Sequence, residues 1–221
     1  MPTSSATLDL AKPRLRGVSH QWAFYVALAL GAALVAAAPG GQPRLAAAIY
    51  ALSVAALFGT SALYHRVTWA SQAARRWMKR LDHSMIFFLI AGTYTPFALL
   101  VLDGTLATVI LVVVWAGALA GVFMKLVWID APKPLVAILY LALGWVAVAA
   151  FPTMLDELGI TGTALVVVGG LLYTAGALVY AFQRPNPAPT VFGYHEVFHA
   201  LVIVAAALQY AAIAFHVIPG S

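Results

Sequence analysis

Two histidines near the end of the chain have the spacing of metal ligands. His195 and His199 lie four residues apart, so on a helix both imidazoles leave the same face about one turn apart. Two ligands do not complete a site, because zinc in proteins takes three or four nitrogen, sulfur or oxygen ligands. The chain has no cysteine, so the remaining ligands must be sought among its histidines and carboxylates.

The composition predicts that membrane-spanning helices position these histidines. The chain of 221 residues is 63% hydrophobic and only 9% charged, and its apolar runs reach the length needed to cross a bilayer. Windows of about 19 residues, bounded by charged residues, glycine and proline, predict seven spans at approximately 18–38, 45–65, 81–102, 105–128, 135–151, 161–182 and 195–218. Short connections favour one all-α, seven-helix transmembrane domain over residues 18–221, preceded by a mobile cytoplasmic tail at residues 1–17.

Charged residues predict the orientation of this bundle. Of the 12 lysines and arginines, only Arg44 falls on the predicted outer side, and an excess of basic residues marks the cytoplasmic side of a membrane protein. We therefore expect a multi-pass protein of the plasma (inner) membrane with a cytoplasmic N-terminus and an external C-terminus. The net charge of +5 then reflects topology, so no nucleic-acid partner is expected. The first span also fits a signal peptide that ends at Ala36-Ala37-Ala38, although its apolar run is long enough to span the bilayer.

The predicted topology brings more polar residues to the level of the two histidines. His65 ends the second span and Asp82 begins the third, both on the predicted cytoplasmic side. Three neutral imidazoles and a water would form an open tetrahedral zinc site, in which the metal lowers the pKa of its water to about 7 and polarises a carbonyl group. Asp82 is a candidate general base or partner of a ligand, and Ser61 is a candidate hydrogen-bonding neighbour. Ordinary structural roles remain open: helix capping for Asp82, an interfacial position for His65 and packing for Ser61.

A second interpretation of the last motif is a zinc protease. His195-Glu196-x-x-His199 fits the HExxH signature, with Glu196 as the base, and Leu102-Asp103-Gly104 resembles the third-ligand motif of the site-2 protease family. However, Asp103 lies 21 residues after Asp82, about 31 Å along a helix, and therefore on the external side, away from the motif. We expect Glu196 to face lipid headgroups or to cap its helix.

Two other histidines fall outside the predicted site. His20, at the inner end of the first span, is interpreted as an interfacial side chain. His216 lies 17 residues beyond His199, roughly 25 Å along a helix, near the opposite face of the membrane. The segment from Gly117 to Gly121 matches the GxxxG motif, which we interpret as close packing within the chain.

Three motifs of the chain together resemble those of the hemolysin III family, the bacterial branch of the progestin and adipoQ receptor superfamily. They are Ser61-x-x-x-His65, Leu81-Asp82-His83-Ser84 leading to Ala91-Gly92-Thr93-Tyr94-Thr95-Pro96, and His195-Glu196-x-Phe198-His199. The resemblance covers essentially the whole chain. It implies a seven-helix bundle, zinc held by His65, His195 and His199, and Asp82 and Ser61 beside the metal, as in the adiponectin receptors. Those receptors are similar to lipid-amide hydrolases acting on ceramide. They carry tyrosine where this chain has His83, whose role as a spare ligand or lipid contact is open.

From these residues we expect a zinc-dependent hydrolase of an amide or ester bond in a membrane lipid. Two other functions remain open: a membrane-perturbing cytolysin, as the family name implies, and a receptor-like regulator of membrane state with structural zinc. The predicted spans lack the polar lining of a water-filled pore, which speaks against the cytolysin. We expect a membrane lipid as substrate or ligand. Because bacteria mostly lack ceramide, the resemblance in fold does not identify the substrate of this chain.

Overall fold

The computed structural model describes residues 12–221, and these form helices and their connections. Apart from one isolated bridge between Ala188 and Phe192, the described residues contain no β-structure, so the prediction of an all-α fold is confirmed. Their α-helices are α1 (Val18–Ala37), α2 (Gln42–Arg66), α3 (Gln72–Leu100), α4 (Gly104–Val127), α5 (Lys133–Gly144), α6 (Phe151–Phe182) and α7 (Tyr194–Ala212). Shorter helical segments are η1 (Trp145–Ala150), η2 (Ile213–Val217) and η3 (Ile218–Gly220).

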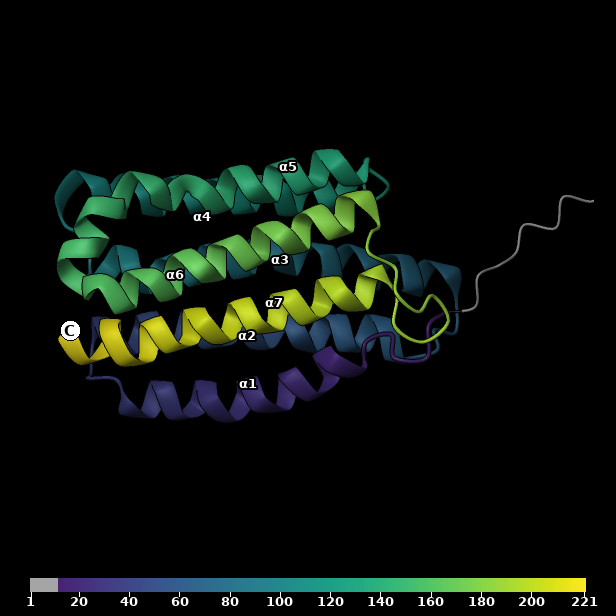
Figure 1. Ribbon diagram of the computed structural model, residues 1–221, viewed down its shortest axis with the longest axis horizontal. Coiled ribbons are helices and arrows are strands. Elements are labelled where there is room, and N and C mark those ends of the chain that lie inside the picture. Colours follow the sequence, from purple (N-terminus) through teal and green to yellow (C-terminus); the bar gives the residue numbers. More distant parts are fainter. Residues whose placement is uncertain (1–11) are drawn as a thin grey trace, which may run out of the picture.

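The helices lie side by side with their axes roughly along one direction (Figure 1). Helices that follow one another in the chain are neighbours in space, and α7 contacts α1, which closes the bundle. Aliphatic and aromatic side chains from all of these helices fill the interior. Because the helices alternate in direction, the end of α2 and the starts of α3 and α7 meet at the same end of the bundle (Figure 1).

The helices are apolar enough for a multi-pass membrane protein. Among residues 12–221, six stretches have the length and composition to cross a membrane: Val18–Ala37, Gln42–Arg66, Gln72–Leu100, Gly104–Val127, Lys133–Phe182 and Tyr194–Gly220. The stretch Lys133–Phe182 has 50 residues and contains both α5 and α6, which run side by side in opposite directions (Figure 1). Gly159 has φ 65 inside this stretch, a backbone conformation that glycine adopts readily. Seven spans and a cytoplasmic N-terminus stay predictions.

Helix α3 begins earlier than the sequence predicted. Its first residue is Gln72, and the side chain of Ser71 caps it by accepting a hydrogen bond from the backbone N–H of Ala74 at 3.1 Å. The basic residues before the apolar run are good helix formers, so they extend the helix into the connection between the spans predicted at 45–65 and 81–102. Asp82 therefore lies well inside α3, and the interpretation of Asp82 as a helix cap is wrong.

The predicted tail is only partly described, and its described part is held in place. Residues 1–11 lie outside the described residues. The backbone N–H groups of Arg14 and Leu15 donate to the carbonyl oxygens of Thr190 and Val191, at 3.0 and 3.1 Å. Residues 12–17, which we name the N-terminal strap, therefore bind to the connection between α6 and α7, whereas the sequence predicted a mobile segment.

Close contact between α2 and α3 depends on Gly92. A Cβ atom at position 92 would collide with the side chain of Ser53, which is fully buried and donates a hydrogen bond to the carbonyl of Tyr50. The glycines of the Gly117 to Gly121 motif also allow close packing. A Cβ atom at Gly117 would collide with the side chain of Leu143 in α5, and one at Gly121 would collide with that of Phe87 in α3. This agrees with the interpretation of close packing within the chain.

We expect Gly92→Ala to lower the stability of the purified protein by about 1–3 kcal/mol, because an added methyl group overpacks this contact. Gly170→Ala in α6 is the matched control, since a Cβ there meets no atom within 4 Å and alanine favours a helix by about 1 kcal/mol. Thermal unfolding in detergent gives the midpoint temperature of each variant. Equal midpoints for the two would contradict the proposed contact.

Candidate metal centre

Three histidines from two distant parts of the chain meet at one end of the bundle. His65 lies in the last turn of α2, and His195 and His199 lie in the first turns of α7. One nitrogen from each ring lies within 4.8 Å of the other two, and all three residues are buried. The histidines that the sequence predicted as metal ligands therefore form a cluster that can hold a metal ion.

The geometry of the cluster suits a metal. Nε2 of His195 lies 3.1 Å from Nε2 of His65, and two nitrogens bound to one tetrahedral zinc ion at 2.0–2.1 Å are about 3.3 Å apart. Nδ1 of His199 is buried without a hydrogen-bond partner among the described residues, and such a buried polar atom calls for a ligand, an ion or water. Imidazole nitrogen is a common ligand of zinc, copper, iron and nickel.

Asp82 lies beside the cluster. Its Oδ2 atom is 3.9 Å from Nε2 of His65 and 3.5 Å from Nδ1 of His83. The same nitrogen of His83 lies 2.9 Å from the carbonyl of Lys79, and its Nε2 lies 3.2 Å from the hydroxyl of Tyr180. Both nitrogens of His83 therefore have partners, and the ring borders the site without joining the three clustered histidines.

His20 joins the site, although the sequence predicted an interfacial side chain for it. The residue is 2% exposed, and its ring stacks on that of His199 with centroids 3.6 Å apart and planes within 5°. Two parallel rings at this spacing do not direct their in-plane lone pairs at one ion, so His20 packs against His199 and is not a further member of the group that could hold a metal. In the sequence, only the position of His20 pointed to the site, because it lies at the same end of its span as the other site residues.

Ser61 contacts His20. Its Oγ atom lies 2.8 Å from Nδ1 of His20, and both side chains are buried. The structure thus links Ser61 to His199 through the ring of His20. This places Ser61 in the site by a contact that the sequence analysis did not include.

Glu196 caps α7. Its Oε2 atom accepts a hydrogen bond from the backbone N–H of Gly193 at 2.8 Å, and its other oxygen pairs with Arg16 of the N-terminal strap. Of the two roles expected for Glu196, capping is the observed one. Asp103 follows the far end of α3, so the structure gives no support to a protease site built from these two acids.

The N-terminal strap covers the cluster. Lys12 donates a hydrogen bond to the carbonyl of His65, and Gly17 lies so close that a Cβ atom there would touch the Cβ atom of His65. Partial burial, followed by the charge of Arg16, lowers the pKa of Lys12 from its ordinary value. A segment with three basic residues, Lys12, Arg14 and Arg16, therefore lies against this end of the bundle.

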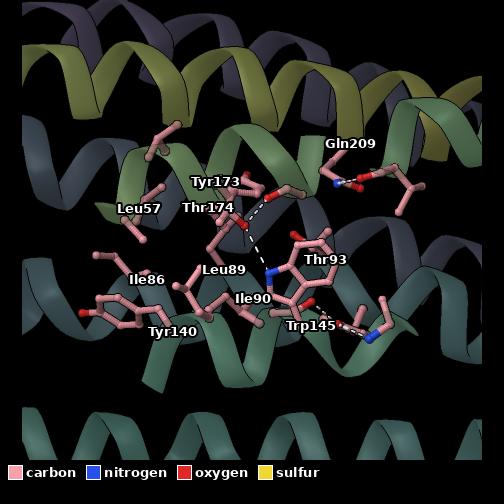
Figure 2. Close-up of a pocket in the computed structure, with 18 of the residues that line it drawn as sticks. Leu57, Ile86, Leu89, Ile90, Thr93, Tyr140, Trp145, Tyr173, Thr174 and Gln209 are labelled. Carbon is pink, nitrogen blue, oxygen red and sulfur yellow. Dashed lines mark hydrogen bonds between the residues drawn. The ribbon is translucent and has the colours of Figure 1, made fainter. Parts of the chain in front are cut away.

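A cavity of about 320 Å³ runs from the histidine cluster into the bundle. His20, Asp82, His195 and His199 line one end of it, and mostly apolar side chains line the rest, several of which are labelled in Figure 2. A polar centre at the end of an apolar cavity is suited to an amphipathic molecule with a hydrocarbon chain.

Comparison with known proteins gives one consistent family. The family model described as "Haemolysin-III related" matches residues 8–210. A protein of Bacillus subtilis (strain 168) named "Hemolysin-3 homolog" is 31% identical over 168 residues, which cover 76% of this chain and 75% of that protein. "Hemolysin-3" of Bacillus cereus is 29% identical over 171 residues, which cover 77% of this chain and 74% of that protein. The human "Monocyte to macrophage differentiation factor" is 27% identical over 173 residues, which cover 77% of this chain and 69% of that protein.

Proposed function

The chain belongs to the haemolysin-III related family, and on that premise we propose that it is a zinc-dependent hydrolase that cleaves an amide or ester bond of a membrane lipid. The observation that carries the proposal is the cluster of His65, His195 and His199 at the end of an apolar cavity. A three-histidine site leaves a fourth position of tetrahedral zinc free for chemistry. The cavity offers a place for the hydrocarbon chain of the lipid.

Each residue of the site has a separate task in this proposal. His65, His195 and His199 would hold the metal, and zinc bound by three histidines would acidify a water and polarise a carbonyl group. The carboxylate of Asp82, beside His65, takes up the proton of the attacking water and returns it to the leaving amine or alcohol. The apolar walls of the cavity hold the acyl chain and keep bulk water from the reacting bond.

Lipid mass spectrometry tests this function. Purified protein is incubated with vesicles made from total bacterial lipid, and the lipids are compared before and after incubation. We expect the loss of one lipid class and the matching appearance of a fatty acid, stopped by a zinc chelator and restored by added zinc. A lipid that binds without turnover would instead favour a receptor-like regulator with structural zinc. Vesicle leakage that persists in a zinc-free variant would favour a membrane-perturbing cytolysin, in keeping with the name "Hemolysin-3" of the B. cereus relative.

His20 is expected to strengthen zinc binding by holding the ring of His199 in place. We expect His20→Ala to weaken zinc affinity by about 10- to 100-fold, the usual effect of losing a residue that orients a ligand. His20→Phe keeps a stacking ring and should retain more of the affinity than alanine does. Competition with a coloured zinc chelator measures the zinc affinity of the wild type and of both variants.

The control for this series is His216→Ala. His216 lies in η2, near the other end of the chain's last helical run, and should not affect zinc affinity. Wild-type affinity in His20→Ala, or equal losses in the alanine and phenylalanine variants, would contradict the stacking role.

A further inference from the structure

Three of the polar side chains that line the cavity each have a buried polar atom without a hydrogen-bond partner among the described residues. Thr93 of α3, Tyr173 of α6 and Gln209 of α7 all line it, and all three are labelled in Figure 2. The Oγ1 atom of Thr93, the hydroxyl of Tyr173 and the Oε1 atom of Gln209 are buried and have no hydrogen-bond partner among the described residues. We name these three residues the mid-cavity polar site.

The mid-cavity polar site lies well away from the histidine cluster. Gln209 is ten residues beyond His199 on α7, and Thr93 is 11 residues beyond Asp82 on α3. At 1.5 Å per residue these spacings are about 15 and 16 Å along the helices. Tyr173 is seven residues from Tyr180 on α6, or about 10 Å. A lipid whose polar end lies at the cluster would therefore reach this site with a part of its hydrocarbon chain well beyond that polar end.

The three polar atoms are free although local partners satisfy similar groups nearby. Thr95 and Thr174 each donate to the carbonyl four residues earlier, at 2.8 Å, whereas Thr93 makes no such bond. Gln209 donates through Nε2 to the carbonyl of Val166 at 3.1 Å, which leaves Oε1 as the free acceptor. Buried polar groups in proteins are nearly always paired, so three free ones around one cavity indicate a missing partner.

The chemistry of the site selects a neutral group that both donates and accepts. The hydroxyls of Thr93 and Tyr173 can donate, and Oε1 of Gln209 can only accept. A ketone could not donate to Gln209, and a carboxylate or ammonium group would be buried without an opposite charge, because the charged lining residue of the cavity is Asp82 at the cluster end. A hydroxyl group satisfies both requirements.

We propose that the mid-cavity polar site binds a hydroxyl group carried part-way along the hydrocarbon chain of a lipid. As a statement about the substrate of the hydrolase, this rests on the proposed function. As a binding site it is independent of turnover, because none of its three residues belongs to the histidine cluster. The hydroxyl of the chain accepts from Tyr173 or Thr93 and donates to Gln209, so the chain is selected by where along its length it is oxygenated.

A binding experiment without turnover tests the proposal. Purified protein in nanodiscs is titrated with three fatty acids of equal length: unsubstituted, hydroxylated near mid-chain, and hydroxylated next to the carboxyl group. Each displaces a fluorescent fatty acid. We expect the mid-chain hydroxy acid to bind about tenfold more tightly than the other two, as one or two additional hydrogen bonds would give.

Variants that remove only the free hydroxyls provide the decisive comparison. Tyr173→Phe and Thr93→Val break no hydrogen bond of the described residues, so both should fold, and the double variant should lose the preference. Tyr50→Phe is the control, because Tyr50 is also a buried tyrosine but bonds to the carbonyl of Ala206 outside the cavity lining. It should keep the preference.

The outcomes separate this site from the proposed enzyme. His199→Ala should abolish hydrolysis and keep the preference for the mid-chain hydroxy acid. Equal binding of the three acids by the wild type, no binding of any of them, or an unchanged preference in the double variant would overturn the proposal. The free polar atoms would then be hydrated by water.

Discussion

Purified protein is expected to contain about one zinc ion per chain, and His199→Ala is expected to remove most of it. The substitution leaves two histidines for a metal that needs at least three protein ligands in an open tetrahedral site. It also removes the ring on which His20 stacks. We expect zinc content to fall to less than about a tenth of the wild-type value, measured by elemental analysis of protein that elutes as a single species.

A second variant in the histidine cluster and a control histidine outside it show whether the loss of zinc is specific or reflects misfolding. His65→Ala changes a different helix and should give the same loss, whereas His216→Ala should keep the full zinc content. Zinc that is absent from the wild type, or undiminished in His199→Ala, would end the zinc proposal. Another metal in the same stoichiometry would retain the centre but change its chemistry, because imidazole also binds copper, iron and nickel.

Asp82→Asn is expected to reduce lipid hydrolysis by about 10²- to 10⁴-fold while zinc stays bound, the range for loss of a general acid or base. Asparagine has nearly the shape of aspartate but cannot take up a proton near neutral pH. Because Asp82 lies beside His65 and outside the cluster of three histidines, the metal should remain. Fatty-acid release measured by mass spectrometry, together with zinc content, gives both quantities for each variant.

Glu196→Gln distinguishes the proposed base from the HExxH interpretation. Glutamine can still accept the hydrogen bond from Gly193 but loses the charge that pairs with Arg16. We therefore expect lower thermal stability with hydrolysis close to that of the wild type. The opposite pattern, with an active Asp82→Asn and an inactive Glu196→Gln, would show that Glu196 is the base and would revive the protease-like mechanism.

The sequence predicted the fold class and the three clustered histidines because both depend on position along the chain. Apolar runs of membrane length predict helices, and each residue advances a helix by a fixed rise. The level of His65, Asp82, His195 and His199 along the bundle could therefore be estimated before any contact was known. The family resemblance rests on the same motifs, and the match over residues 8–210 confirms it.

The remaining features depend on which helices lie next to each other and how each is rotated. The stack of His20 on His199, the contact of Ser61 with His20 and the strap over His65 join residues that the sequence separates widely. The start of α3 at Gln72 was also missed, because basic residues suit both an interfacial loop and a helix end.

For this protein, the sequence alone determined a helical membrane protein with its candidate ligands at one level, since helix rise converts residue number into depth. Only the tertiary structure decided that His20 supports His199, that Glu196 caps α7, and that Thr93, Tyr173 and Gln209 face one cavity. Lateral packing of helices sets those contacts through shape complementarity among side chains far apart in the chain, and no spacing rule along the sequence expresses it.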